Sequence, residues 1–373
     1  MNRRLDPFSG VALASGLASL GVFISGPAGT PPQLIAALDL LIIASAWFTR
    51  SPAVTLTDGL VLTFVVVVGC SVLVHVLHSA DLAGQAGAGF WLYVVALWAI
   101  AWRGIDCIAT VRAIDRPRQR MINLLVPLLF GAWLVFLWES VVVGLAVPQV
   151  LLPPPSAIVL RLVSSLDVLR QDFYQTFMKA VLAGYVIGCG AGFVVAVLVD
   201  RVPFLQRGLL PIGNLVSALP IVGVAPIMVM WFGFDWQSKA AVVVIMTFFP
   251  MLVNAVSGLA AAGALEKDLM RSYGAGYWQN LMKLRLPSAL PFLFNALKIN
   301  STLAMIGAIV AEFFGTPTVG MGFRISTEVG RMNVDMVWAE IVVAAIAGSA
   351  FYGVMALLER KFTFWHASYR HSR

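Results

Sequence analysis

Long apolar runs alternate with short polar segments along this chain, and the runs show no period-two pattern that would indicate β-strands. A helix needs roughly 20 apolar residues to cross the bilayer core, and in lipid its backbone groups must be satisfied within the segment. We therefore predict an all-α, polytopic transmembrane bundle of about ten spans. The predicted spans are 8–27, 33–49, 58–78, 88–104, 122–147, 177–199, 209–232, 238–262, 293–314 and 336–358. The first two are short and rich in glycine, and a shallow hairpin is the alternative for them.

Composition supports lipid as the main solvent. The chain is 60% hydrophobic and only 12% charged, against about 25% charged residues in average soluble domains. The three cysteines, Cys70, Cys107 and Cys189, lie far apart, without metal-ligand spacing or an even disulfide framework, so we expect packing roles for them and no metal site.

The formal net charge of +7 fits membrane orientation better than nucleic-acid binding. With the N-terminus in the cytoplasm and the spans alternating, most arginines and lysines fall on the inside. The outside segments then hold only Arg161, Arg170, Lys179, Lys239, Arg324 and Arg331. The positive-inside rule thus predicts that both termini are cytoplasmic in a bacterial inner (plasma) membrane, with or without the first two spans.

An arginine-rich stretch at 103–120 is the clearest internal boundary. It divides the chain into an N-terminal additional region (1–105), a basic cytoplasmic linker (106–120) and a six-span half (121–373). In that half, the PPP run at 153–155 excludes a helix interior. Apolar residues at helical spacing after Ser156 predict an amphipathic helix on the membrane surface. These residues are Ile158, Leu162, Leu166 and Leu169.

A charged insertion at 263–291, before the penultimate span, is too polar to cross the membrane. Its pattern predicts a helix, a break at Gly274 and Gly276, and a second helix from Tyr277 that Pro287 ends or kinks. The alternative is a basic amphipathic loop lying on lipid headgroups.

This insertion resembles the EAA loop of binding-protein-dependent ABC importer permeases. The family pattern places Gly nine residues before Ile-x-Leu-Pro, and here nine residues separate Gly274 from Leu284-Arg285-Leu286-Pro287. Asp268-Leu269-Met270 stands where the family has Glu-Ala-Ala, so Asp268 and Glu266 both remain candidates for the acidic contact. The segments LLPPPSAI, ALPIVGVAPIMVMWFGF and AEFFGTPTVGMGF are similar to the nitrate/sulfonate/taurine branch of that family. The resemblance covers about residues 119–373.

The resemblance implies a permease subunit that is not itself an enzyme and that moves a small solute inward by alternating access. The chain has no Gly-x4-Gly-Lys-Ser/Thr phosphate loop, so we expect no cofactor in it and ATP on a partner. The implied partners are cytoplasmic ABC ATPase subunits, an extracytoplasmic solute-binding protein and a second permease in a homodimer. The residues implied in ATPase coupling are Glu266, Asp268, Arg271, Gly274, Tyr277, Trp278, Leu281, Leu284 and Pro287. Tyr277, Trp278 and Leu281 would fill a groove on the ATPase, and Asp268 and Arg271 would form its polar rim.

Three prolines in one span, Pro211, Pro220 and Pro226, predict a bent helix. Either it lines the translocation path, with Asn214 and Ser217 facing it, or neighbouring helices absorb the bend.

Two acidic residues, Glu139 and Glu312, lie in or at the edge of spans, where carboxylates are costly. We expect gating or interhelix hydrogen bonding from them, and Glu312 is a path candidate. In the loop after it, Arg324, Glu328 and Arg331 are candidates for docking the binding protein. The alternative is i,i+4 ion pairs, Arg324 with Glu328 and Arg331 with Asp335.

Small residues recur at Gly184, Gly188 and Gly192, which predicts close helix packing within the subunit or between two permeases. For the solute, the stretch 321–335 resembles the subgroup that imports vitamins or their precursors (riboflavin or the thiamine pyrimidine). A sulfonate, taurine or nitrate is the other choice. The rival function is a secondary transporter driven by an ion gradient, which predicts inverted repeats and paired intramembrane acids.

Overall fold

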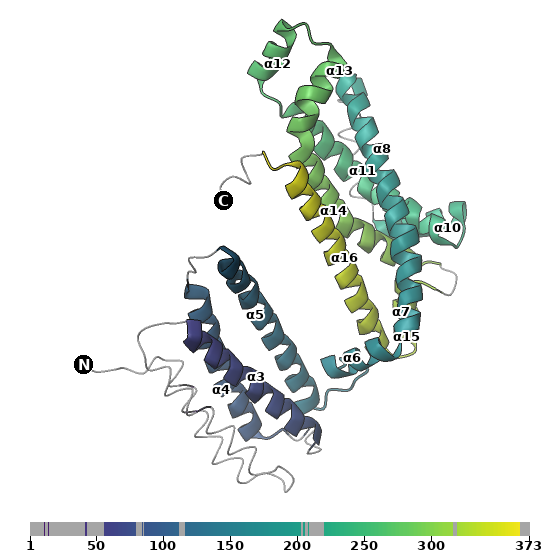
Figure 1. Cartoon of the computed structure of the whole chain (residues 1–373). Coiled ribbons are helices and arrows are strands. Elements are labelled where there is room, and N and C mark those ends of the chain that lie inside the picture. Colours follow the sequence, from purple (N-terminus) through teal and green to yellow (C-terminus); the bar gives the residue numbers. More distant parts are fainter. Residues whose placement is uncertain are drawn as a thin grey trace, which may run out of the picture. The chain divides into compact units, whose positions relative to one another are not determined.

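The structure, a computed structural model, is all helical throughout the residues it describes (Figure 1). These residues are Val11, Ala14, Ile42, Gly84, 56–79, 86–111, 116–202, 204–205, 208, 220–315 and 319–365. Within them, seven helices are long and apolar enough to cross a membrane. Each of the seven overlaps one predicted span, which confirms the predicted all-α fold class.

The remaining three predicted spans fall wholly or partly outside the described residues. Of 8–27 and 33–49, only Val11, Ala14 and Ile42 are described. The last part of 209–232 forms α10 (Ile221–Phe232), a helix of 12 residues with Pro220 at its N-cap. Asn214 and Ser217 lie outside the described residues.

The chain divides into two compact units, 1–158 and 159–373. In the first unit, α3 (Leu56–Ser79), α4 (Ala88–Thr110) and α5 (Arg116–Gly144) share one apolar core. Tyr93 and Leu97 of α4 are fully buried in it, with Trp133 of α5. Because α4 runs on to Thr110 and α5 begins at Arg116, most of the stretch predicted as a basic linker is helical.

The second unit holds the rest of the six-span half, and the division falls within α6 (Pro155–Ser164). Its elements are α7 (Leu166–Phe173), the π-helical η1 (Tyr174–Val181), α8 (Leu182–Arg201), α10, α11 (Trp236–Ala260), α12 (Ala264–Ser272), α13 (Tyr277–Asn280), the π-helical η2 (Leu281–Arg285), α14 (Leu286–Glu312), α15 (Met321–Gly330) and α16 (Val334–Phe362).

The predicted surface helix after Ser156 is two helices. Ser165 leaves the helical conformation between α6 and α7. From Leu166 the helix then continues through η1 and α8 to Arg201 without a break, 36 residues in all. The second part of the predicted surface helix, from Leu166, is therefore the end of a span and not a separate helix. The spacing of apolar residues alone does not reveal this difference.

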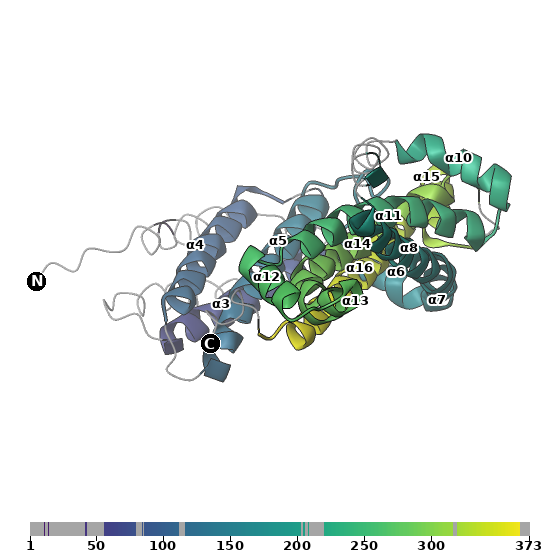
Figure 2. The same cartoon turned by 90° about the horizontal axis from the view of Figure 1, so that it is seen from above.

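Helix α11 lies at the centre of this unit and packs against both α8 and α14, which group together in Figure 2. Glycines of α8 make the close approach to α11 possible. A Cβ added at Gly184, Gly188 or Gly192 would come within 2.7, 2.9 and 2.6 Å of the carbonyl oxygens of Ala240, Val244 and Phe248. The contacts ascend in the same order on both helices, so α8 and α11 run parallel. The glycine row packs within the subunit, one of the two roles that its spacing predicts.

Candidate functional site

The insertion at 263–291 forms a helical elbow, which we define as residues 264–280, at one end of the second unit (Figure 1). Helix α12 ends in a Schellman motif, in which Gly274 N–H donates to Arg271 O (2.9 Å) and Ala275 N–H to Met270 O (3.0 Å). Gly274 has φ +67°, the left-handed conformation that favours glycine. The predicted helix, break at Gly274 and second helix from Tyr277 are all observed.

The outer face of the elbow carries an apolar row. Leu265, Leu269 and Tyr273 follow one another at four-residue spacing, which places them on one face of α12. Their exposed fractions are 84%, 57% and 81%, and Trp278 on α13 is 57% exposed. Asp268 and Arg271 flank this row as an exposed pair 3.4 Å apart. Glu266 is exposed too, near Gly263 at the start of α12. Contiguous exposed apolar side chains of this kind indicate a surface that another protein or the membrane covers.

Two predicted coupling residues lie on the inner side of the elbow. Leu281 is 3% exposed and belongs to the core of the unit, and Tyr277 packs against that core. Leu284 is half-buried. In this structure, then, Trp278 is available to fill a groove on another protein, whereas Leu281 is not. Leu265, Leu269 and Tyr273, which we did not predict as contact residues, occupy the accessible face.

The prediction that Pro287 ends the second helix is wrong. Helix α14 begins at Leu286 and runs to Glu312, and with α13 and η2 it makes one helix of 36 residues from Tyr277, so Pro287 lies inside a continuous helix. The π-helical turn η2 lies directly before the proline. Helices kink at prolines and at such turns, and the kink that we gave as the other choice stays a prediction.

A largely buried ion pair fixes the helix that follows the elbow to the ends of two neighbouring helices. Arg285 and Asp200 form a two-pronged pair, with Arg285 Nη1 2.7 Å from Asp200 Oδ2. Arg285 Nε also donates to Leu259 O at the end of α11 (2.9 Å), and the Tyr277 hydroxyl lies 3.1 Å from Asp200 Oδ2. Sequence reasoning missed this joint. The one signal was an aspartate at the end of an otherwise apolar run.

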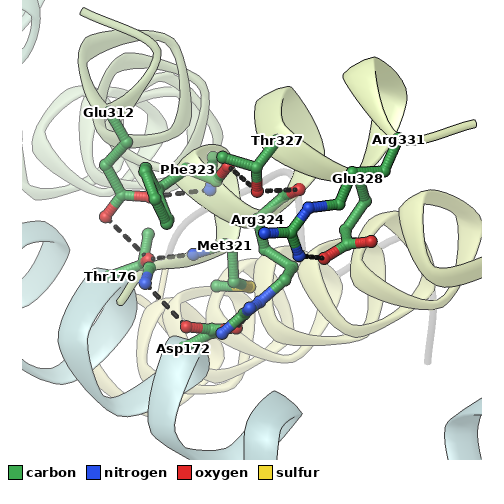
Figure 3. A network of polar contacts seen from close by, with 11 residues as sticks. Asp172, Thr176, Glu312, Met321, Phe323, Arg324, Thr327, Glu328 and Arg331 are labelled. Atoms are coloured by element: carbon green, nitrogen blue, oxygen red, sulfur yellow. Dashed lines mark hydrogen bonds and ion pairs between the residues drawn. The ribbon is translucent and has the colours of Figure 1, made fainter. Parts of the chain in front are cut away.

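At the opposite end of α14, buried side chains hold the start of α15 (Figure 3). Thr176 Oγ donates to Glu312 Oε1 (2.8 Å) and accepts from Met321 N–H (2.9 Å). Glu312 Oε2 accepts from Gly322 N–H (2.7 Å). Glu312 is 2% exposed, so its carboxylate serves as an interhelix hydrogen-bond acceptor at a helix N-terminus, where negative charge is favoured.

Asp172 extends this cluster, which we call the α15 network, to Arg324. Its Oδ1 accepts from Gly320 N–H (2.7 Å), and its Oδ2 lies 2.9 Å from Arg324 Nε. Burial alone would lower the pKa of Arg324, but the hydrogen bond and the charge of Asp172 raise it above its ordinary value. Asp172, which we did not predict, is fully buried.

The predicted i,i+4 ion pairs of this loop do not form. Arg324 turns inward to Asp172, and Asp335 pairs with Arg161 on α6 (2.8 Å). Arg331 instead lies 3.2 Å from Glu328. The reason is that α15 ends at Gly330, so Arg331 and Asp335 are not on one helix. Of the docking candidates, Arg331 is exposed, Arg324 is half-buried and Glu328 is buried.

The path candidates are not brought together among the described residues. Pro220 is an exposed N-cap, and Glu312 is buried in the α15 network. Sequence reasoning also missed Glu340 on α16, which is fully buried close to Asp172 and whose carboxylate oxygens accept no hydrogen bond from the residues that the structure describes. An acid inside an apolar span was the available signal.

In the first unit, the other predicted acid also serves a helix start. Glu139 accepts from Ser156 N–H (2.9 Å) and from the Ser156 hydroxyl (2.7 Å) in the first turn of α6. His78 Nε2 lies 3.2 Å from the same carboxylate. Interhelix hydrogen bonding is thus what both glutamates do in this structure.

Comparison with known proteins places this arrangement in one family. The family model described as "Binding-protein-dependent transport system inner membrane component" matches residues 184–364. A probable ABC transporter permease protein of Haemophilus influenzae is 30% identical over 240 residues, 64% of this chain and 97% of the relative. The formylaminopyrimidine transport permease protein ThiX of Halalkalibacterium halodurans is 31% identical over 66% of this chain and 98% of its own. The riboflavin transport system permease protein RibX of Chloroflexus aurantiacus is 28% identical over 69% and 95%.

These relatives are transport permeases, and their class favours an ATP-driven importer over the ion-gradient alternative. Each aligns over nearly its whole length, which leaves about a third of this chain outside the alignment. With its apolar helices and its matched 184–364 segment, this chain belongs to the family of binding-protein-dependent inner-membrane components, the permease subunits of ABC importers.

Proposed function

We propose that this permease subunit imports its solute by alternating access, driven by a cytoplasmic ABC ATPase that docks on the elbow at 264–280. The observation that carries the proposal is the exposed row of Leu265, Leu269 and Tyr273 on the first arm of the elbow, with an exposed Trp278 on the second. Such a helix face suits a groove on a partner, where a few large apolar side chains supply most of the binding energy. ATP is bound by that partner.

The elbow continues into a helix that reaches the other end of the unit. The 36 residues from Tyr277 to Glu312 span about 54 Å at 1.5 Å per residue. At the near end, Arg285 joins this helix to Asp200 of α8 and to Leu259 of α11. At the far end, Glu312 accepts from the backbone of α15. Force that the ATPase exerts on the elbow would therefore tilt α14 together with α8 and α11 and disturb the α15 network. In this way the unit would switch between two global states.

The distribution of basic residues supports a cytoplasmic elbow, an extracytoplasmic α15 and cytoplasmic termini. In this orientation the binding protein would approach the α15 side, where Arg331 is 68% exposed. We further propose that two copies of the permease form a homodimer, with two ATPases below it.

For the solute we propose a vitamin or vitamin precursor. Support comes from the relatives named for formylaminopyrimidine and riboflavin. A sulfonate, taurine or nitrate remains the other choice.

The test is uptake of radiolabelled solute by proteoliposomes that hold the permease, its ATPase and its binding protein. Tyr273→Asp should lower ATP-driven uptake at least tenfold and weaken co-purification of the ATPase, because a charge would enter an apolar groove. Phe364→Asp, a comparably exposed aromatic (67%) outside the elbow, is the matched control. Equal uptake and equal ATPase recovery in the wild type and in Tyr273→Asp would contradict the docking proposal.

A further inference from the structure

An open groove with a volume of about 1230 Å³ lies in the second unit, between η1 and the turn that precedes α11. It belongs neither to the elbow nor to the α15 network. Tyr174, Gln175 and Lys179 line one side, and Phe234 and Asp235 line the other. The volume exceeds that of most small-molecule sites, roughly 300–1,000 Å³, so a solute can enter with water around it.

The polar side of the groove is built from a chain of hydrogen bonds. Lys179 Nζ donates to Gln175 Oε1 (2.9 Å), and Gln175 Nε2 donates to Asp235 Oδ1 (2.8 Å). Gln175 is 8% exposed, and Asp235 also accepts from Trp236 N–H as the N-cap of α11. Asp235 Oδ1 thus accepts two hydrogen bonds, whereas within the described residues the Lys179 ammonium donates one of its three N–H groups, to Gln175.

The π-helical turn sets the position of this lysine. In a π-helix the backbone bonds run from i to i+5, so residues five apart come to lie near one another on one face. Tyr174 and Lys179 are five apart in η1, and Lys179 Nζ lies 5.5 Å from the Tyr174 ring centroid. π-Helical turns inside α-helices occur frequently at functional sites.

The groove faces water or protein and not the lipid core. The exposed face of this helix carries Asp167, Arg170 and Gln171 before it reaches Tyr174 and Met178, and is apolar without interruption further on, at Val186 and Ile187. Charged side chains are costly in hydrocarbon and within spans mark ion or substrate pathways. This polarity therefore indicates the mouth of an aqueous path.

We propose that this groove is a solute-binding site of the permease, and that it takes a flat aromatic or heteroaromatic solute carrying oxygen acceptors or an anionic group. Tyr174 and Phe234 expose 56% and 66% of their surfaces and offer ring faces for stacking. Lys179 and Arg170 supply donors and positive charge for the solute's oxygens. The proposal rests on the proposed transport function and gives it a class of substrate.

The direct test is binding to the purified permease in nanodiscs, without binding protein or ATPase. Riboflavin binding is followed by its fluorescence, and equilibrium dialysis measures the binding of a radiolabelled formylaminopyrimidine and of two non-aromatic solutes, the zwitterion taurine and the anion bicarbonate. We expect at least one of the flat solutes to bind. Tyr174→Leu and Lys179→Met should each weaken that binding about tenfold, whereas Val186→Leu, on the same helix outside the groove, should leave it unchanged.

Several outcomes would overturn the proposal. One is that neither flat solute binds, or that only taurine and bicarbonate do. Another is that both groove variants bind the flat solute as the wild type does. A third is that the variants lose only the stimulation of ATP hydrolysis by the binding protein, which would make the groove a protein-docking surface. A fourth is that the only change in the variants is the loss of the permease dimer in size-exclusion chromatography, which would make the groove a dimer contact. The coupling proposal stands or falls separately, because Tyr273→Asp should abolish stimulation of the ATPase whatever the groove binds.

Discussion

The Asp200–Arg285 joint allows the proposed coupling route to be tested with a double-mutant cycle. The two side chains are 11% and 16% exposed, so removing one of them leaves the other as a largely buried charge. Breaking such a pair from one side costs about 3–5 kcal/mol. We take about 3 kcal/mol for Asp200→Asn and for Arg285→Gln, since both groups keep some solvent contact.

The double variant should cost little more than either single one, because no charge is then left without its partner. This difference gives a coupling energy of about 3 kcal/mol, at the upper end of values for contacting residues. At 2–4 °C per kcal/mol for a unit of this size, each single substitution should lower the melting temperature by about 6–12 °C. Thermal scans of the detergent-solubilised permease, all at one heating rate, measure it.

The same variants report on coupling. In proteoliposomes with the ATPase and binding protein, the single variants should move less solute per ATP hydrolysed, because α14 no longer carries α8 with it. Costs that add independently, together with an unchanged ratio of solute to ATP, would refute the reasoning.

Three further predictions rest on other contacts. Glu312→Gln should lower the melting temperature, since a carboxylate that accepts two hydrogen bonds contributes about 1.5–3 kcal/mol. Glu340→Met should maintain or raise it, because that carboxyl is buried close to Asp172 and accepts no hydrogen bond from the described residues. Equal losses of melting temperature in thermal scans would contradict this pair of predictions. Gly274→Ala should cost about 1–2 kcal/mol of stability, because residue 274 has a positive φ. Gly274→Pro should abolish ATP-driven uptake while the permease still inserts, since proline cannot adopt φ +67°. Normal uptake by the proline variant would refute this. Gly188→Leu should destabilise the permease by about 1–3 kcal/mol or more through overpacking against α11. Gly190→Leu should be near neutral, because nothing lies within 4 Å of a Cβ at that position. Equal melting temperatures of the two variants would count against this prediction.

The sequence predicts the helices of this chain well because lipid imposes length and apolarity on every span. For the same reason it predicts the elbow, where charge and two glycines interrupt the pattern. Pro287 was misjudged because a local rule does not distinguish a proline that ends a helix from one that follows a π-helical turn inside a continuous helix.

The sequence alone could not identify side-chain partners that lie far apart along the chain. Asp172 is 152 residues from Arg324, and Asp200 is 85 from Arg285. A local rule offers only neighbours three or four residues away, which led to the incorrect pairing of Arg331 with Asp335. Leu281 was assigned to a partner's groove for a related reason, since an amphipathic pattern does not say whether an apolar face meets its own core or another protein.

The glycine row of α8 limits how the bundle can move. At three successive turns the α8 backbone lies close against the backbone and side chains of α11, and α8 carries no side chain there that could bend aside. Sliding one helix along the other would push these contacts into collision, so an axial shift between the two is blocked. Opening and closing of the transporter must then occur by a tilt of α8 and α11 as one rigid pair. The helices that pack on the outer sides of this pair must shift to accommodate the tilt.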